Sequence, residues 1–116
     1  MSLKLAVKLA TSNTTYSRWP LGCVITKGGA VQAVGWSSLK SDPRFPGCSI
    51  HAEDHALRQM RHDARGCVLY VARLLRTGQV ALAKPCVACQ QLITDAGIKR
   101  VVYTISDNEW GTWKPS

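Results

Sequence analysis

The chain has 116 residues, of which 46% are hydrophobic and 19% are charged, and its formal net charge is +8. The length fits one domain and the composition excludes a disordered chain, so we expect residues 1–116 to form a single domain. No apolar stretch of the sequence approaches the ~20 residues that a membrane-spanning helix needs, which argues against a membrane protein.

The basic balance comes from 15 Lys and Arg against 7 Asp and Glu, and the first acidic residue is Asp42. Such a balance favours anionic partners such as nucleotides, nucleic acids or an acidic surface, although a solvated basic face is the alternative interpretation. The five cysteines, together with no recognisable signal peptide, argue against a disulfide framework. We therefore expect a cytoplasmic protein in which clustered Cys and His bind metal or take part in catalysis.

The first third of the chain predicts a helix followed by a hairpin. Residues 3–11 place apolar side chains at helical spacing, and residues 1–19 as a whole also loosely resemble a cationic transit peptide. Residues 21–26 contain a continuous apolar run that is typical of a buried strand. Residues 27–29 (Lys-Gly-Gly) predict a tight turn, after which residues 30–36 return as the second strand.

The middle of the chain predicts a loop, a helix and a third strand. Residues 37–48 contain two prolines, a glycine and several polar residues, which is typical of a long functional loop. Residues 51–61 have helical periodicity, and residues 67–71 read as a strand. The pattern of residues 74–83 is ambiguous, apart from a turn signal at residues 76–78.

The last third predicts a helix and two strands. Residues 86–96 form the helix, which Gly97 ends, and residues 100–105 form the fourth strand. Residues 109–113 predict a fifth strand. Only 11 residues follow position 105, whereas a parallel crossover takes about a dozen or more, so this strand should return antiparallel. The interleaved helices and strands predict a layered α/β domain with a mixed sheet.

Two short motifs stand at the starts of the two later helices. The first is His51-Ala52-Glu53, and the second runs from Pro85 through Cys86 to Cys89. A Cys-x-x-Cys spacing lets two thiolates meet one ion, and a helix N-terminus favours anionic sulfur. With His51 as a third ligand, one tetrahedral position stays open, which is typical of a catalytic zinc.

Glu53 lies two residues after His51, close to such an ion but not needed as a ligand. Zinc lowers the pKa of a bound water to about 7, so hydroxide becomes available at neutral pH. Glu53 can then take the proton from that water, protonate a ring nitrogen and assist the departure of ammonia. The motifs therefore indicate hydrolytic removal of an amino group.

The paired motifs H-x-E and P-C-x-x-C resemble those of the cytidine and deoxycytidylate deaminase superfamily. The resemblance extends over most of residues 20–105 and includes residues 21–25, 35–37, 89–93 and 96–103. It implies a three-layer α/β/α fold around a mixed five-stranded sheet. It also implies a Zn²⁺ cofactor held by three ligands: His51, Cys86 and Cys89.

The same resemblance assigns further roles around the expected metal. Glu53 would be the catalytic proton shuttle, and the backbone N–H of Ala52 would contact the base carbonyl. Relatives often carry Asn after the second strand, where it touches the sugar, whereas this chain has Ser37. Residues 70–84 form a longer link than in many relatives, and we expect them to reshape the rim of the pocket.

Our leading hypothesis is conversion of a cytosine nucleoside or nucleotide to the uracil form, by a homo-oligomer. The alternative enzyme acts on cytosine or adenine in single-stranded DNA or RNA, which the basic charge would favour. An antiparallel last strand is similar to the free-nucleoside branch of the superfamily. His51 as a ligand is instead similar to the branches that act on tRNA, single-stranded DNA or deoxycytidylate. The two signals conflict, so both alternatives stay open.

A different class of protein also stays open. Cys48 lies three residues before His51, so with the Cys86 and Cys89 pair it would complete a closed, structural zinc site in a nucleic-acid-binding module. His55 is either a further ligand or pocket residue, or a half-buried histidine with satisfied hydrogen bonds. Trp110 and Trp113 either stack on a base or cover the edge of the sheet or an oligomer interface. 

Overall fold

The structure is a computed structural model of the chain. It describes residues 2–12, 21–36, 38–42, 45–50, 52–60, 63–75, 77, 79–85 and 87–115.

Five strands lie side by side in the order β2-β1-β5-β7-β8, and the short strand β6 pairs with β5. Their bounds are β1 (Leu21–Lys27), β2 (Ala30–Trp36), β5 (Val68–Leu74), β6 (Val80–Ala81), β7 (Arg100–Ser106) and β8 (Glu109–Trp113). Strands β5 and β7 run parallel, whereas β2, β6 and β8 each run antiparallel to their neighbours. The prediction of a mixed sheet with an antiparallel last strand is therefore confirmed, and β6 is an addition to the five expected strands.

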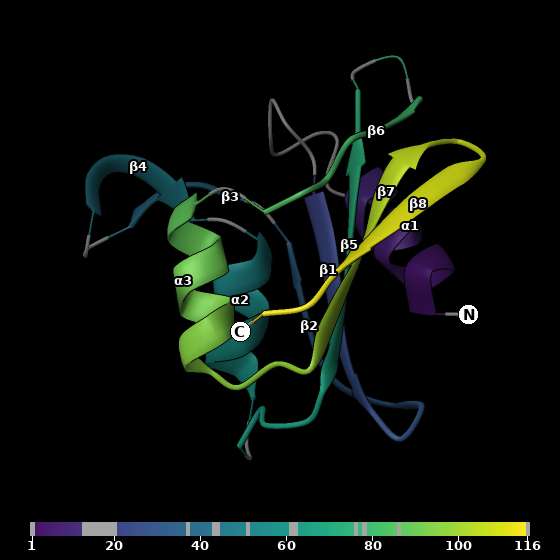
Figure 1. The fold of residues 1–116 in the computed structure, drawn as a ribbon. Coiled ribbons are helices and arrows are strands. Elements are labelled where there is room, and N and C mark those ends of the chain that lie inside the picture. The colour runs from purple at the N-terminus through teal and green to yellow at the C-terminus, as the bar shows by residue number, and fades with distance from the viewer. Residues whose placement is uncertain are drawn as a thin grey trace.

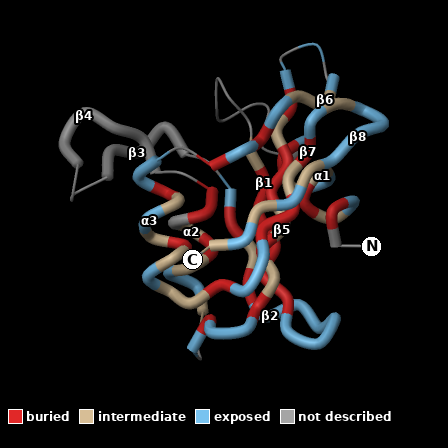
Figure 2. Tube along the Cα trace, in the orientation of Figure 1, coloured by how far each residue is buried: buried red, intermediate tan, exposed pale blue. Residues whose placement is uncertain are grey.

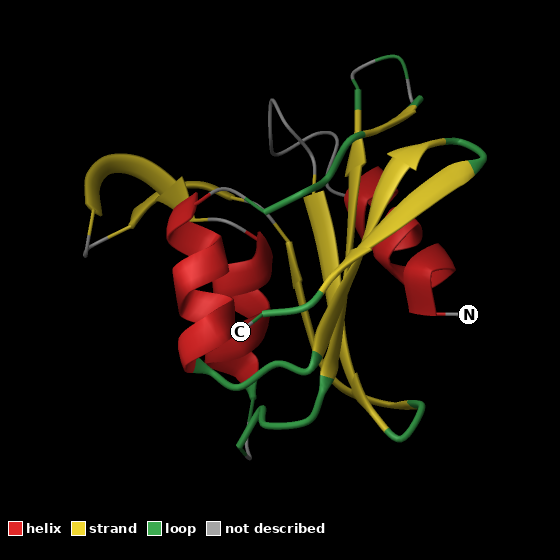
Figure 3. Cartoon of the chain, viewed as in Figure 1, coloured by secondary structure: helices red, strands yellow, loops and turns green. Residues whose placement is uncertain are grey.

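Helices cover both faces of this sheet, as a three-layer fold requires. Helix α1 (Ser2–Ser12) packs on β1 and β5 from one face, while α2 (Ala52–Gln59) and α3 (Val87–Asp95) lie on the other face (Figure 1 and Figure 3). The interpretation of the N-terminal segment as a first packing helix holds for α1. Among the described residues, no helix is long and apolar enough to cross a membrane.

The two helices on one face begin at the same end of the sheet. Helices α2 and α3 lie side by side and run in the same direction, and both begin where β5 and β7 end (Figure 1). In α/β sheets, ligands bind beyond the carboxyl ends of the parallel strands. This end of the molecule is therefore the natural place for a functional site.

The prediction of a loop over residues 37–48 is wrong. The structure has a separate two-stranded antiparallel sheet there, made of β3 (Ser38–Asp42) and β4 (Phe45–Ile50). Their residues do not alternate between apolar and polar, which is the pattern that would have predicted strands. The two strands form a small sheet apart from the main one. Prolines do not prevent this, since each strand of a two-stranded sheet has an unpaired edge.

The larger core lies between the sheet and the pair α2 and α3. Its largest fully buried members include Ile25, Leu69, Val71, Ile93 and Val101. A smaller cluster under α1 contains Ala6, Val24 and Ala72. Buried residues gather in the strands at the centre of the sheet (Figure 2). Because both faces are covered, β1 needs apolar residues on both sides, which explains its continuous apolar run.

Candidate active site

Helix α2 carries the first motif. Ala52 and Glu53 are its first two residues, and they are fully buried and 3% exposed, respectively. His51 and Ser37 lie outside the described residues. A carboxylate in the first turn of a helix is stabilised by the helix dipole. The structure thus places an almost fully buried, acidic group at the start of α2.

A glycine fixes how closely α2 approaches the sheet. A Cβ atom added to Gly35 of β2 would come within 2.5 Å of the Ala52 carbonyl oxygen and 2.9 Å of the Ala56 Cα atom. Both neighbours are backbone atoms of α2, and both alanine side chains are fully buried. The first turn of α2, with Glu53, is therefore held against β2 at a distance that only glycine permits.

Cys23 on β1 lies in the core close to Glu53. Burial, and to a smaller extent the Glu53 carboxylate, raises the pKa of the Cys23 thiol well above its usual value. At neutral pH the thiol therefore stays protonated and acts as a small apolar side chain, as the sequence predicts. Cys23 adds no second anion beside Glu53.

Helix α3 carries the second motif. Cys89 lies in its first turn and is 2% exposed, whereas Cys86 lies outside the described residues. Pro85, just before the helix, is buried, and its carbonyl oxygen accepts a hydrogen bond of 2.9 Å from the Gln90 side chain. The Cys89 sulfur thus lies near the N-terminus of a helix, where the dipole favours a thiolate.

The residues that the structure describes fit a zinc site in the chemistry of their donors. A cysteine at the N-terminus of α3 supplies the soft, anionic ligand that zinc prefers, and a buried carboxylate lies at the N-terminus of the adjacent helix. No group of three His, Cys, Asp or Glu side chains clusters within the described part of the chain. Of the three expected ligands, Cys89 alone belongs to that part.

His55 has partners of its own. Its Nδ1 atom accepts a hydrogen bond of 3.2 Å from the backbone N–H of Trp36, and its ring meets the Trp36 ring edge-to-face at 4.4 Å. It is neither fully buried nor fully exposed. These contacts favour the interpretation of His55 as a half-buried residue with satisfied hydrogen bonds. The rival fourth ligand, Cys48, has a side chain outside the described part of the structure.

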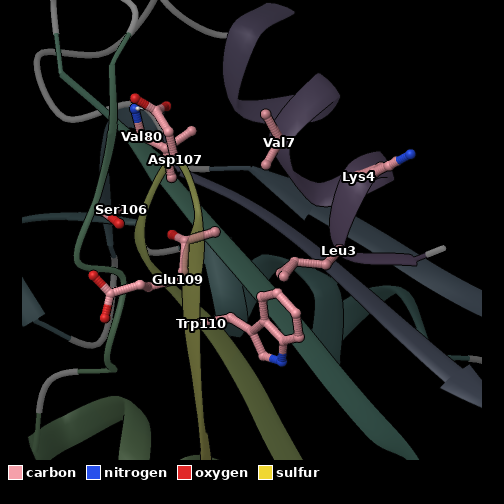
Figure 4. A pocket seen from close by; sticks show the side chains of 9 residues that line it. Leu3, Lys4, Val7, Val80, Ser106, Asp107, Glu109 and Trp110 are labelled. Carbon is pink, nitrogen blue, oxygen red and sulfur yellow. Dashed lines mark hydrogen bonds between the residues drawn. The ribbon is translucent and has the colours of Figure 1, made fainter.

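The two C-terminal tryptophans lie in different surroundings. Trp113 is partly buried and packs against the larger core. Trp110 is 57% exposed and lines a pocket of about 190 Å³ with Leu3 and Val7 of α1 (Figure 4). Because α1 supplies part of its lining, that pocket lies on the face of the sheet opposite α2 and α3 (Figure 4). Within this chain, Trp110 therefore does not stack on a base bound at the N-termini of those helices.

An open mixed sheet, covered by one helix on one face and two on the other, is the cytidine deaminase-like fold. Residues 1–105 match the family described as the cytidine and deoxycytidylate deaminase zinc-binding region, and the chain belongs to this family. It is 30% identical to the deoxycytidylate deaminase of Mycobacterium phage D29, over 81% of this chain and 84% of that protein. The resemblance predicted from the two motifs is therefore confirmed.

Two other relatives are longer proteins. The chain is 36% identical to the riboflavin biosynthesis protein RibD of Escherichia coli, over 88% of this chain but 25% of RibD. It is 29% identical to a tRNA-specific adenosine deaminase of Streptococcus pyogenes, over 91% of this chain and 62% of that protein. The chain thus spans a quarter to somewhat under two thirds of these two relatives.

Solved structures share the fold. The dCMP deaminase of cyanophage S-TIM5, in complex with dCMP and dUMP, superposes with a TM-score of 0.67 at 22% identity, over 88% of this chain and 76% of that one. Cytidine deaminase from Burkholderia pseudomallei gives 0.68 at 18% identity, over 99% and 94%. At such identities the likeness defines the fold alone.

Proposed function

We propose that this chain is a zinc-dependent hydrolytic deaminase that converts a cytosine nucleoside or nucleotide to the uracil form and releases ammonia. The observation that carries the proposal is the matching placement of Glu53 and Cys89. Each is buried in the first turn of its helix, and the two helices begin side by side in a chain of the deaminase family. We further propose that residues 1–116 act as one deaminase domain.

Three residues would hold the zinc: His51, Cys86 and Cys89. When bound, zinc supplies an activated water at neutral pH. Glu53 takes a proton from the attacking water and delivers it to the ring nitrogen next to the carbon under attack. It then passes the second proton to the amino group, which leaves as ammonia. Burial excludes other water from the Glu53 carboxylate, so the same group can carry both protons.

Residues around Glu53 would orient the base. The Ala52 backbone N–H, at the N-terminus of α2, is free of an intrahelical partner by its position and suits the base carbonyl. Ser37 follows β2, where it would contact the sugar. A nucleotide of dCMP size is supported by the phage deoxycytidylate deaminases to which the chain is similar.

A polynucleotide is the second candidate substrate. The net charge of +8 favours a phosphate backbone, and a tRNA-specific adenosine deaminase is among the relatives. A third chemistry enters through RibD and through the similar diaminohydroxyphosphoribosylaminopyrimidine deaminase/5-amino-6-(5-phosphoribosylamino)uracil reductase of Thermotoga maritima.

The test is ammonia release from zinc-loaded protein. The panel contains cytidine, deoxycytidine, CMP, dCMP, a phosphoribosylaminopyrimidine, and short DNA and RNA oligonucleotides. We expect the cytosine compounds to react and Glu53→Gln to abolish the reaction while zinc stays bound. Glu109→Gln, on an exposed strand, is the matched control and should keep the activity. Reaction of no member of the panel would overturn the proposal. Reaction of oligonucleotides alone, falling steeply with salt, would favour the second candidate.

A zinc measurement separates the enzyme from a structural-zinc module. If the site has three ligands, Cys48→Ala keeps its zinc and Cys89→Ala loses it. Loss of zinc from Cys48→Ala would instead favour a closed, structural site. We also propose that the protein works in the cytoplasm as a homo-oligomer. Cell fractionation tests the location, and analytical ultracentrifugation of the purified protein tests the oligomeric state.

A further inference from the structure

One threonine forms hydrogen bonds to the residues that precede the second motif. Thr104 of β7 is 3% exposed. Its hydroxyl group donates a 2.8 Å hydrogen bond to the Ala81 carbonyl and accepts a 3.3 Å hydrogen bond from the Arg73 backbone N–H. Its own carbonyl oxygen accepts a 2.9 Å hydrogen bond from the Ala83 N–H. Thr104 thus connects β5, β7 and the segment of residues 81–85.

Two side chains hold the same segment at other points. The Arg73 guanidinium donates a long, 3.5 Å hydrogen bond to the Leu82 carbonyl. The Gln90 amide donates the 2.9 Å bond to the Pro85 carbonyl, from the second turn of the helix that follows. Four of the five residues from 81 to 85 therefore have a backbone group fixed by a neighbouring strand or helix. Position 86 comes next along the chain.

We propose that Thr104 is a positioning residue for the metal site. It holds the segment of residues 81–85 so that the second motif starts at the right place. This inference rests on the proposed zinc site. Thr104→Val removes the hydroxyl group that donates to the Ala81 carbonyl, which lies in a part-buried position. This carbonyl then regains a donor when the segment shifts toward solvent. Movement of residues 81–85 is transmitted along the backbone to Cys86, one of the expected ligands.

Outer partners of metal ligands typically change metal affinity by about 10- to 100-fold when they are removed. Thr104→Val keeps the shape of the side chain but removes the hydroxyl group. Thr104 acts on the segment before Cys86 and not on a ligand itself, so we expect the variant to raise the zinc dissociation constant by about threefold to tenfold, at or below the lower end of that range. Thr104→Ser restores the hydroxyl group and should return the constant to within about twofold of the wild-type value.

Thr26 provides the matched control. It is also 3% exposed, but it pairs with Val68 at the beginning of β5, whereas Thr104 meets Arg73 near the end of β5. Thr26→Val removes the same group from a buried strand at the far end of the sheet. It should lower thermal stability without changing zinc affinity, so it separates a general loss of stability from an effect on the metal site.

The experiment measures zinc dissociation constants by chelator competition for the full chain and these three variants. It also records the visible spectrum of the Co²⁺-loaded proteins, which reports the ligand geometry. Weaker zinc binding and an altered Co²⁺ spectrum in Thr104→Val alone would support the inference. Equal affinities in Thr104→Val and the wild type would overturn it and leave the deaminase proposal intact. A wild-type protein that binds no zinc would overturn both.

If Thr104→Val does not fold, Gln90→Leu replaces it, because this variant removes the other anchor of the segment from a partly exposed side chain. Weaker zinc binding in a folded Gln90→Leu variant would support the role of the segment. An unchanged dissociation constant in that variant would overturn it.

Discussion

Gly35→Ala tests how closely α2 approaches the sheet, because at Gly35 the backbone of β2 contacts the backbone of α2. Alanine at this position would place its Cβ 2.5 Å from the Ala52 carbonyl oxygen and 2.9 Å from the Ala56 Cα. Ordinary contacts of a Cβ begin at 3.4 Å. Neither backbone atom can rotate away, so α2 itself must move from β2, and Glu53 moves with it.

The size of the effect follows from these distances. To raise 2.5 Å to 3.4 Å, the first turn of α2 must move by roughly 1 Å, and such overpacking typically costs about 1–3 kcal/mol of stability. A misplacement of about 1 Å can lower the rate of a positioned reaction about 100-fold. We therefore expect Gly35→Ala to lose both stability and kcat.

The control for this variant is Gly22→Ala on the neighbouring strand β1. Its Cβ would lie 2.7 Å from the Ala10 backbone nitrogen and 2.8 Å from the Leu9 Cβ, so it pushes on α1. Helix α1 covers the opposite face of the sheet from α2, so this variant should lose stability but keep kcat.

Urea denaturation gives the stability of both variants, and ammonia release at saturating substrate, below their unfolding temperatures, gives kcat. Wild-type stability in Gly35→Ala would refute the close approach of α2. An equal loss of kcat in both variants would show that the activity follows stability rather than the position of Glu53.

Three further predictions concern other parts of the fold. Because the folded state keeps the Cys23 thiol neutral above its usual pKa of 9.0, the unfolded state loses a proton first. The free energy of unfolding should therefore fall as the pH rises above 9.0, and it should fall less in Cys23→Ala. Denaturant titrations at several pH values measure this free energy, and the same dependence on pH in both proteins would contradict the prediction. Gly97 ends α3 with a φ of +80°, so Gly97→Ala should lose about 1–2 kcal/mol in urea denaturation. His55→Phe removes the acceptor for the Trp36 N–H and should cost about 1 kcal/mol, while elemental analysis still finds zinc at the wild-type level; loss of zinc would make His55 a ligand.

Elements with strong local signals could be predicted from the sequence. The apolar run around Val24 predicts β1, and the turn-forming residues Asp107 and Asn108 fit the tight connection through which β8 returns antiparallel. Gly97 marks the end of α3, because a positive φ suits glycine and two backbone hydrogen bonds close the helix there. In each case a local rule and the final packing favour the same structure.

Features that depend on partners far along the chain could not be predicted in this way. Strands β3 and β4 pair with each other rather than with the main sheet, and their residues have no alternating pattern. The two residues of β6 are held by β5 and by contacts from Thr104, which lies 23 positions after Ala81. A single threonine in an apolar strand gives no signal of such a role.

Some features of the candidate site could likewise be predicted from the sequence, and others could not. Burial of Glu53 and Cys89 at helix starts follows from motifs that the sequence makes visible. The role of Gly35 was missed, although a glycine inside a strand commonly marks close approach of another backbone. The roles of His51, Cys86 and Ser37 remain predictions.

The antiparallel direction of β8 affects how far the α1 face of the sheet is covered, and it says little about which substrate binds. A parallel last strand would need a crossover helix, and such a helix would cover β7 and β8. The antiparallel hairpin supplies none, and α1 packs chiefly on β1 and β5. Trp110 is therefore left 57% exposed beside Leu3. Since α2 and α3 begin on the other face, an antiparallel ending does not by itself select a free nucleoside. We therefore propose that the segments which directly precede these two helices, β4 and residues 81–85, select the substrate.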